Sequence, residues 1–366
     1  MSHHNMKSRH TRCSSIARLN SGFSLIELMV AIALGLLILA GMALVFSNSS
    51  ATRNEIDRTN RQIENGRYAM ELLRDDVQLA AFFGEIDMAK VLVTASMPAS
   101  IPDPCANTLT ERTFNTTGNV PGILSLPVQG VNNYSASAAA PDNLSCLTGA
   151  NAVKPGTDVI VVRRVKTWIA GAAGCDVIAN GKPYLQTSLC TTPPTVAAST
   201  TVTHALAIYP SPTEFVHKLK DCTTAAPLRP YVIYLYFVGT DNILKRAEFT
   251  GTVMGNVTSL VDGIENLQVD YGVDRLDTDP STVVADGNAN EYRANPVSIA
   301  NWQNVVTVQI NLLARNTEVS PGYSDTKTYN LGPSAGSVGP FNDGFRRHVY
   351  SSLVRIQNVS ARRETP

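Results

Sequence analysis

The side chains best suited to hold a hard cation lie in one acidic stretch, residues 270–291. Four carboxylates there could offer the oxygen ligands that Ca²⁺ prefers, namely Asp274, Asp277, Asp279 and Asp286. Their spacing departs from the EF-hand loop, and a solvated acidic loop is the better explanation of the same residues. We therefore expect no bound metal, and we keep these four aspartates as the chain's best calcium candidate.

Catalytic chemistry has no recognisable motif in this sequence. It contains no GxSxG elbow, no HExxH helix, no P-loop and no dinucleotide fingerprint. Three of the six histidines lie within the first 22 residues, and the others are scattered without carboxylates at ligand spacing: His204, His217 and His348. We expect these three to be surface or strand-edge residues, and we expect neither a cofactor nor an enzymatic activity.

The cysteines are more suited to disulfides than to metal binding. None belongs to a CxxC pair, which argues against a zinc site or a thioredoxin-like centre. One of the six lies near the amino terminus, and five lie in the middle of the chain: Cys105, Cys146, Cys175, Cys190 and Cys222.

Disulfides among these five would stabilise a loop-rich region if it is exported. We consider two pairs, Cys105 with Cys146 and Cys175 with Cys190, and the second would close a loop worth about 3 kcal/mol. Five is an odd number, so at least one thiol is free or pairs outside the chain. Buried, reduced cysteines are the alternative.

A basic leader precedes a long apolar run. Residues 1–22 contain four basic side chains and no acidic one, although the whole chain of 366 residues has a formal net charge of zero. The run from Leu28 to Phe46 has 19 residues and no charge, and as a helix it would span about 30 Å, the thickness of a bilayer core. The positive-inside rule keeps the leader in the cytoplasm and places residues from about 48 onward across the membrane.

Three interpretations compete for this segment. A cleaved secretory signal would have a shorter apolar core, of about 7–15 residues, and would be cut near Ala51. A plain signal anchor explains the length of the run but not Glu27, since a carboxylate at the centre of a span costs about 2.5–3.5 kcal/mol and less near its end. The third interpretation rests on the residues that surround Glu27.

The heptapeptide Gly22-Phe23-Ser24-Leu25-Ile26-Glu27-Leu28 resembles the class III prepilin cleavage motif. The resemblance implies that a prepilin peptidase cuts between Gly22 and Phe23 and methylates the new amino terminus at Phe23. Such a cut keeps the apolar helix, which anchors the subunit in the membrane and later packs in a filament core. In this family Glu27 would pair with the Phe23 amino group of a neighbouring subunit and would set the axial register, because a buried carboxylate is costly unless it is paired.

The elements that position these residues begin with one long helix. No proline occurs between Phe23 and Glu85, so the transmembrane half, residues 23–47, is expected to continue into an amphipathic half, residues 48–85, ending near Ala81. The apolar stripe of the second half recurs every seven residues and should pack on a globular head: Ile56, Ile63, Met70 and Val77, with Leu73 and Ala80 beside them. The opposite face should stay exposed: Arg53, Asp57, Arg61, Glu64 and Arg67.

The head should consist of strands joined by long loops. Residues 86–230 read as its loop-rich, cysteine-containing part, in which a second sheet or subdomain is possible, and residues 231–366 as its antiparallel β part. Strands are predicted at 158–165, 231–238, 243–249, 267–271, 305–313 and 349–356. Around Val308 the residues alternate apolar and polar, which indicates a sheet with one buried face. We therefore predict an α+β fold in which the long helix packs on an antiparallel sheet, and the prepilin resemblance implies that this fold is type IV pilin-like.

Three further stretches resemble PilW-like minor pilins of type IV pili: residues 64–76 (ENGRYAMELLRDD), 261–272 (VDGIENLQVDYG) and 346–352 (RRHVYSS). The resemblance implies a low-abundance subunit that primes filament assembly with other minor pilins and the major pilin, lies near the tip, and helps present a tip adhesin. The filament would serve twitching motility, adhesion or DNA uptake. The sequence has no broad basic surface, so we expect no direct nucleic-acid binding.

The expected location follows from the anchor. The subunit would cross the inner membrane once, with its head in the periplasm, before it enters the pilus. A minor pseudopilin of type II secretion shares the leader, Glu27 and the helix, and is the nearest alternative. A membrane-tethered periplasmic binding protein or enzyme is the second alternative, and it would need a polar constellation in the head.

Overall fold

The computed structural model describes residues 22–86, 101–105, 126–135, 144–191, 195–196, 200–201, 204–276, 278, 284–361 and 363. The chain divides into two compact units, residues 1–56 and residues 57–366, and each is described by itself. Of the leader that the sequence places at 1–22, only Gly22 belongs to the described residues.

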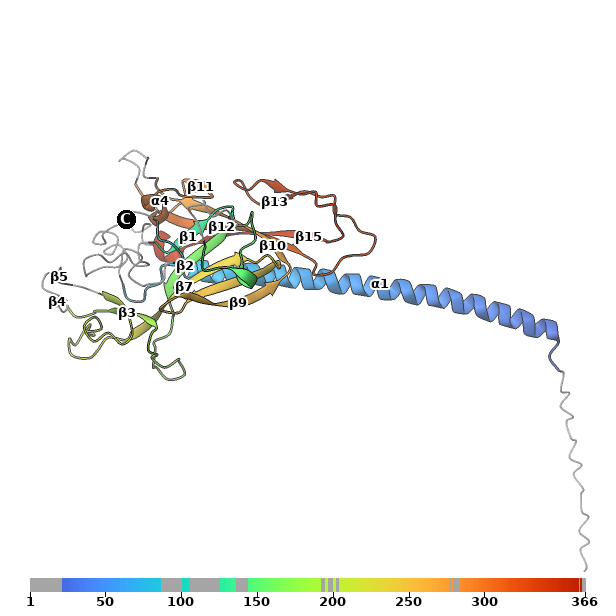
Figure 1. Ribbon diagram of the computed structural model, residues 1–366, viewed down its shortest axis with the longest axis horizontal. Helices are drawn as coiled ribbons and strands as arrows, with labels where there is room; N and C mark the ends of the chain where they lie inside the picture. The colour runs from blue at the N-terminus through green and yellow to red at the C-terminus, as the bar shows by residue number, and fades with distance from the viewer. Residues whose placement is uncertain are drawn as a thin grey trace, which may run out of the picture. The chain divides into compact units, whose positions relative to one another are not determined.

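The described residues of the first unit form one helix preceded by three non-helical residues. Helix α1 spans Leu25–Gln78, and its part up to Ile56 lies in this unit (Figure 1). Leucine, isoleucine and alanine dominate it, and no proline interrupts its hydrogen bonding. The helix ends three residues before Ala81, where the sequence predicted its end, and Ala81 itself has a positive φ of 60°.

The second unit contains a seven-stranded sheet in which every pair is antiparallel. Its order is β1-β2-β7-β3-β6, with β8 paired to β7 and β9 paired to β8. The strands are β1 (Val128–Val131), β2 (Val159–Val165), β3 (Pro183–Thr187), β6 (His204–Ile208), β7 (Leu228–Val238), β8 (Ile243–Phe249) and β9 (Met254–Asp262).

Strand β7 crosses the domain boundary that the sequence suggested between residues 230 and 231. Its residues 231–236 pair with β2, and its residues 228–230 pair with β3. Residues 231–238 are all buried, which requires both faces of the strand to be covered. The longer strands of the cysteine-containing region, β1, β2, β3 and β6, therefore join the sheet that β7 centres, while the short strands β4 (Thr195–Val196) and β5 (Thr200–Thr201) pair with each other.

A second, four-stranded antiparallel sheet has the order β11-β10-β12-β15. Its strands are β10 (Ile264–Val273), β11 (Glu291–Arg293), β12 (Val305–Arg315) and β15 (Arg347–Arg355). Val308, Ile310 and Leu312 of β12 are fully buried on one face, as their alternation with polar residues predicted. The six predicted strands are all present, so the α+β class with a helix packed on antiparallel sheets is confirmed.

The remaining elements are short. They are η2 (Gly149–Asn151), β4 (Thr195–Val196), β5 (Thr200–Thr201), α4 (Ile299–Gln303), β13 (Tyr329–Asn330), β14 (Ser337–Val338) and α5 (Gln357–Ser360). The main hydrophobic core of the second unit joins Ala69, Leu73 and Val77 of α1 to buried side chains of both sheets. The helix therefore contributes to the core of the head as an element of it.

Candidate functional site

The residues around the expected cut directly precede α1. Gly22, Phe23 and Ser24 are non-helical, and the Phe23 side chain is 87% exposed. The backbone N–H of Ser24 donates to Oε2 of Glu27 at 3.0 Å. A glutamate that reaches back to the N–H three residues earlier is half of a capping box, and it also places negative charge at the positive end of the helix dipole. Glu27 thus has a structural role within its own chain, which the Ser-x-x-Glu spacing could have revealed.

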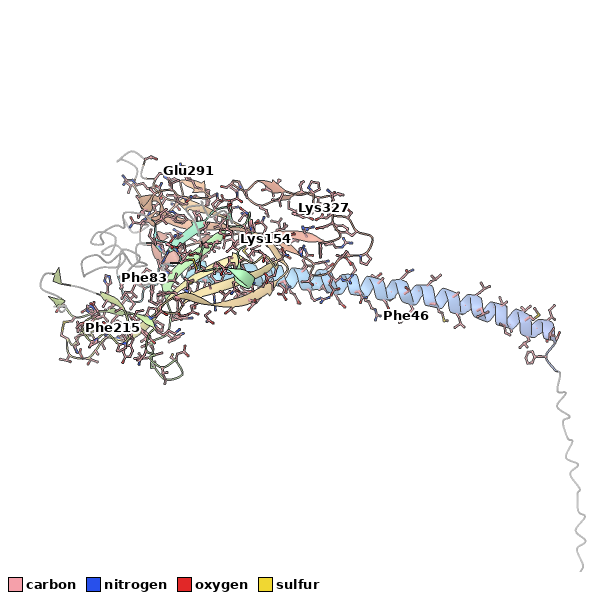
Figure 2. All side chains as sticks on the ribbon, viewed as in Figure 1. Phe46, Phe83, Lys154, Phe215, Glu291 and Lys327 are labelled. Atoms are coloured by element: carbon pink, nitrogen blue, oxygen red, sulfur yellow. A yellow bond between two sulfur atoms is a disulfide. The ribbon has the colours of Figure 1, made fainter. Side chains whose placement is uncertain are left out.

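The apolar residues that follow Glu27 are not covered by any other described residue of their unit. Large side chains around the whole circumference are more than half exposed, for example Leu28, Leu37 and Phe46. Figure 2 shows the Phe46 side chain directed away from the helix. Helix α1 is long and apolar enough to cross a membrane by length and composition. An exposed apolar surface of this kind marks a site of contact with a membrane or with another protein.

The length of α1 inside the second unit docks through small and polar residues. Nε2 of Gln62 donates to the carbonyls of Ala314 at 2.9 Å and Arg346 at 3.1 Å. Gly66 lies directly against the ring of Tyr350, where an added Cβ would come within 2.1 Å of a ring carbon. The absence of a side chain at Gly66 is therefore what allows the helix and strand β15 to meet.

The predicted seven-residue stripe is only partly correct. Leu73, Val77 and Ala80 are fully buried, but Ile56 is 53% exposed and Ile63 is 41% exposed. The buried face runs instead through Gln62, Gly66, Ala69, Leu73, Asp76 and Val77. A search for apolar periodicity misses it because three of these six residues are polar or lack a side chain. The opposite face is exposed as predicted.

An ion pair fastens the end of the docked length. Asp76 accepts hydrogen bonds from Nε of Arg164 on β2, at 3.0 Å, from Nη2 of the same arginine, and from the hydroxyl of Tyr236 on β7. Both charged side chains are about nine-tenths buried. Burial, followed by the nearby Asp76 carboxylate, raises the pKa of Tyr236, so the hydroxyl stays a donor. The pair joins the helix to the centre of the larger sheet.

The three stretches singled out in the sequence meet in space. Nδ2 of Asn65 in the first donates to the carbonyl of Asp262 in the second, at 3.1 Å. Glu265 in the second pairs with Arg347 in the third, with Nη2 to Oε1 at 3.1 Å. Tyr350 in the third packs on Gly66 in the first. Each stretch therefore contacts the other two, and together they form the junction of α1, β10 and β15.

Arg347 is the centre of this junction. Besides Glu265, its guanidinium binds Asp325 at 2.9 Å and Asp343 at 2.7 Å, and its side chain is 1% exposed. Burial alone would lower the pKa of Arg347, but the hydrogen bonds to Asp343, Glu265 and Asp325 outweigh burial and raise it. Three carboxylates around one buried cation hold the loop between β12 and β15 against the sheet.

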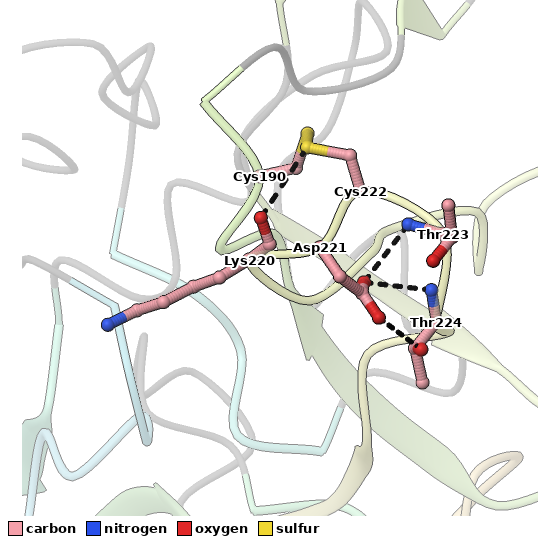
Figure 3. The surroundings of a disulfide bond; sticks show 6 residues. All are labelled: Cys190, Lys220, Asp221, Cys222, Thr223 and Thr224. Atoms are coloured by element: carbon pink, nitrogen blue, oxygen red, sulfur yellow. Dashed lines mark hydrogen bonds between the residues drawn. A yellow bond between two sulfur atoms is a disulfide. The ribbon is translucent and has the colours of Figure 1, made fainter.

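Two disulfides form among the described cysteines, and one differs from the predicted pairing. Cys105 bonds to Cys146, a pair that the sequence suggested. Cys190 bonds to Cys222 (Figure 3) and not to Cys175, which is half-buried and forms no disulfide with a described cysteine. The backbone N–H of Leu189 donates to the carbonyl of Lys218 at 2.9 Å, and this contact brings the Cys190 segment beside the Cys222 turn. Spacing along the chain cannot show such a contact.

The Cys222 turn is shaped by the residue before it. Oδ1 of Asp221 accepts the backbone N–H groups of Thr223 and Thr224 at 3.0 Å and 2.9 Å, and its other oxygen binds the Thr224 hydroxyl. These bonds, that from the Thr224 hydroxyl first, lower the pKa of Asp221 to about 2. They hold Cys222 at a φ of 58°, a left-handed conformation that a non-glycine residue adopts only with such support.

The acidic stretch is organised around protein donors. Oδ1 of Asp274 accepts the backbone N–H of Asp286 at 3.1 Å, and Oδ2 accepts that of Gly287 at 3.0 Å and Nη1 of Arg363 at 2.9 Å. The side chain of Asp274 is fully buried, and Arg363 neutralises its charge. No pattern in the sequence connects these two residues. Asp277 and Asp279 lie outside the described residues. Within the described ranges, no three or more His, Cys, Asp or Glu residues are grouped to hold a metal ion.

Two of the three histidines of the head are not surface residues. His204 and His217 are 2% and 0% exposed, and burial lowers the pKa of His204 to about 4. The expectation of surface histidines is therefore wrong for this pair, although His204 does begin strand β6. His348 lies on β15 and packs its ring edge-on against Tyr350, with 4.8 Å between ring centroids.

Comparison with known proteins connects this geometry to a family. Residues 235–358 match the family model described as Type IV Pilus-assembly protein W, and residues 17–43 match the model of the prokaryotic N-terminal methylation motif. The first match contains two of the three converging stretches, and the second contains the Gly22–Glu27 segment. The resemblance to PilW-like minor pilins and to the prepilin motif is thus confirmed.

Other comparisons add less. No curated protein matches the chain. Among solved structures, a type IV-like pilin from Thermus thermophilus is similar at 12% sequence identity and a TM-score of 0.26, with 57% of this chain and 83% of that chain covered.

Proposed function

We propose that this PilW-like prepilin is a minor pilin that helps to initiate a type IV pilus and lies at or near its tip. The observation that carries the proposal is the capped apolar helix directly after the Gly22–Phe23 bond. Its side chains from Leu28 to Phe46 are exposed around the circumference. That surface needs a bilayer before assembly and a bundle of like helices afterwards.

Glu27 has two successive partners in this proposal. Before assembly it accepts the N–H of Ser24 in its own chain, as the 3.0 Å contact supports. After the cut, the methylated Phe23 amino group of a neighbouring subunit provides a positive charge that a lone backbone N–H does not. A charged pair in apolar surroundings is the stronger contact, so Glu27 would hold the subunit at a defined axial height.

The proposed location follows from the anchor and the disulfides. The subunit crosses the inner membrane once with its head in the periplasm, and then enters the pilus. The bonds Cys105–Cys146 and Cys190–Cys222 support an oxidising compartment for the head, since disulfides are rare in the cytoplasm. The prepilin peptidase is its processing partner, and other minor pilins, the major pilin and a tip adhesin are its assembly partners.

We propose a structural role and not a catalytic one. Asp76, Glu265 and Arg347, which are buried and charged, hold elements of the head together. Asp274 likewise holds the segment that follows β10 to Arg363. Ionisable groups used in this way stabilise packing and do not converge on a substrate.

The test combines processing with piliation. The full chain is expressed in its own cells, and filaments are sheared from the surface. We expect mass spectrometry of this fraction to find the chain beginning at N-methylated Phe23, and we expect a deletion strain to lose surface filaments. A mature chain that keeps its leader, or one that begins near Ala51, would contradict the proposal. Loss of protein secretion with normal pili would favour a pseudopilin instead.

A further inference from the structure

Strand β15 is an edge strand whose outer side can be read from its hydrogen bonding. The N–H of Ile356 donates to the carbonyl of Val306 at 2.9 Å, and the N–H of Asn316 donates to the carbonyl of Arg346 at 3.0 Å. The register between β12 and β15 is continuous between these two bonds. Because antiparallel partners alternate, the even-numbered residues of β15 bond to β12, and the backbone groups of Val349, Ser351 and Leu353 point outward.

These outward groups have no partner within the described part of the chain. Ser351 and Leu353 are exposed, and the Leu353 side chain is 59% exposed. The ends of the strand are different, because Arg347 is enclosed by its three carboxylates and the Arg355 side chain reaches the carbonyl of Gly287. The open part of the edge is therefore about five residues long, centred on Ser351.

Strand β9, at the edge of the larger sheet, shows how an edge is normally protected. Its pairing with β8 has two register shifts, at Leu244/Lys245 and at Arg246/Glu248. Bulges of this kind twist an edge away from regular pairing. The pairing of β15 has none over its nine residues, and no proline or lysine interrupts the strand. Its edge is thus regular enough to accept another strand.

A groove runs beside this open edge. It has a volume of about 380 Å³ and lies between β15, at Tyr350 and Ser352, and the exposed face of α1, at Arg67, Glu71 and Arg74. Two guanidinium groups face one carboxylate there, so the groove is net positive. Pairing with a second copy through β15 would bring two such grooves toward each other, which like charges disfavour. A strand with an acidic side chain fits both the backbone edge and the charge.

We propose that β15 binds an extended strand of a different filament subunit, with an acidic side chain of that strand between Arg67 and Arg74. The outward N–H and carbonyl groups of Val349, Ser351 and Leu353 supply the backbone pairing. The proposal rests on the proposed function, which it deepens by naming the surface and the kind of partner. It also gives a use to the junction of α1, β10 and β15, since that junction fixes the edge and the groove wall relative to each other.

The experiment uses photo-crosslinking of the full chain in cells that make all the filament subunits. Leu353 is replaced by p-benzoyl-phenylalanine, with Val177, 78% exposed on a loop before β3, as the matched exposed position. Irradiation should join position 353, and not position 177, to a chain with its own prepilin motif. Peptide mapping should place the bond in an extended segment with Asp or Glu within two residues.

Two sets of variants connect the adduct to the proposed contacts. Ser351→Pro removes one outward N–H, in a place where an edge strand tolerates proline, and should lower the yield about tenfold, while Ser351→Ala should not. Arg67→Glu with Arg74→Glu changes only exposed helix residues and should lower the yield by a similar factor without affecting the β12–β15 ladder.

The outcomes separate this inference from the proposed function. An adduct that Ser351→Pro and the charge reversals leave unchanged overturns the edge proposal, and so does an adduct with a helical segment or with a second copy of this chain. Absence of an adduct, when the chain is found in the sheared filament fraction with methylated Phe23, overturns it as well. Absence of the chain from that fraction, with the position-353 adduct still formed in the membrane, contradicts the tip location and supports the edge.

Discussion

The two lengths of α1 differ in what covers their apolar surface. Up to Ile56 the large side chains are exposed around the helix, for example Ile26, Leu37 and Val45. From Asp57 to Gln78 one face is buried in the head, and that face includes Gln62, Gly66 and Asp76. The length richer in large apolar residues is thus the one whose side chains are left exposed.

The difference shows that one helix can combine two modes of packing. In the proposed function the first length depends on partners outside the chain, so wide apolar coverage suits it and side-chain shape matters less. The second length is stabilised by its own head, where fit and polar bonds decide the contact. Substitutions in the first length should therefore affect assembly, and substitutions in the second should affect stability.

Substitutions of Glu27 should have the largest effect, and they should affect filament assembly without affecting the stability of the head. Glu27→Ala and Glu27→Gln should both be cut and methylated, and neither should support filaments. Glutamine keeps the capping contact to Ser24 but has no charge, so the pair separates capping from charge pairing. Urea unfolding of the detergent-solubilised chain, followed by tryptophan fluorescence, should be unchanged. Normal filaments with Glu27→Gln would leave the cap as the only role of this residue.

Asp76 tests the second length. Asp76→Ala leaves Arg164 buried without its carboxylate and should destabilise the head by about 3–5 kcal/mol in urea unfolding. Asp75→Ala is the matched control, because its side chain is 63% exposed, and should stay within about 0.5 kcal/mol. Equal effects of the two changes would contradict the fastening role of the ion pair.

Each length of α1 contains a glycine, so the same substitution can be compared in both. Gly66→Val would put side-chain atoms into the ring of Tyr350 and should cost about 1–3 kcal/mol. Gly35→Val has nothing within 4 Å and should leave the unfolding of the head unchanged. Combining Gly66→Val with Tyr350→Ala should recover part of the loss if overlap with the ring is its cause. An additive loss in the double variant would indicate that the backbone freedom of Gly66 matters more.

Ile63 should give the smallest effect. It belongs to the seven-residue stripe but is 41% exposed, so Ile63→Ser should cost about 0.5 kcal/mol or less. Leu73→Ala, on the buried face, should cost about 2–5 kcal/mol in the same unfolding assay. If Ile63→Ser lowered the free energy of unfolding as much as Leu73→Ala, the seven-residue stripe would be the docking face after all.

Strand positions could be predicted because each depends on local composition. The segment Tyr231–Val238 is rich in β-branched and aromatic residues, and alternation around Val308 identifies a half-buried strand. Which strands pair with each other could not be predicted in the same way. That β7 pairs with β2 at one end and β3 at the other depends on how distant segments fit together.

Side-chain partners far apart in the chain were the least accessible to sequence reasoning. Cys190 pairs with Cys222, which the backbone contact between Leu189 and Lys218 brings beside it, and not with Cys175, which is nearer in the sequence. Asp274 was considered a calcium ligand, but Arg363, 89 residues later, reaches the same oxygen. In both cases the residue type indicated that a partner was required, and only the tertiary structure showed which residue it was.

The sequence alone determined the prepilin segment and the apolar length of the helix, because a cleavage motif and a bilayer span are contiguous and depend on residue type and length. Tertiary structure decided which face of α1 docks, which cysteines pair and which edge of the smaller sheet stays open. Those features depend on contacts between residues tens to hundreds of positions apart, and no local pattern records them. Gly66 shows the limit most clearly, since its importance lies in the ring of Tyr350 that occupies the space beside it.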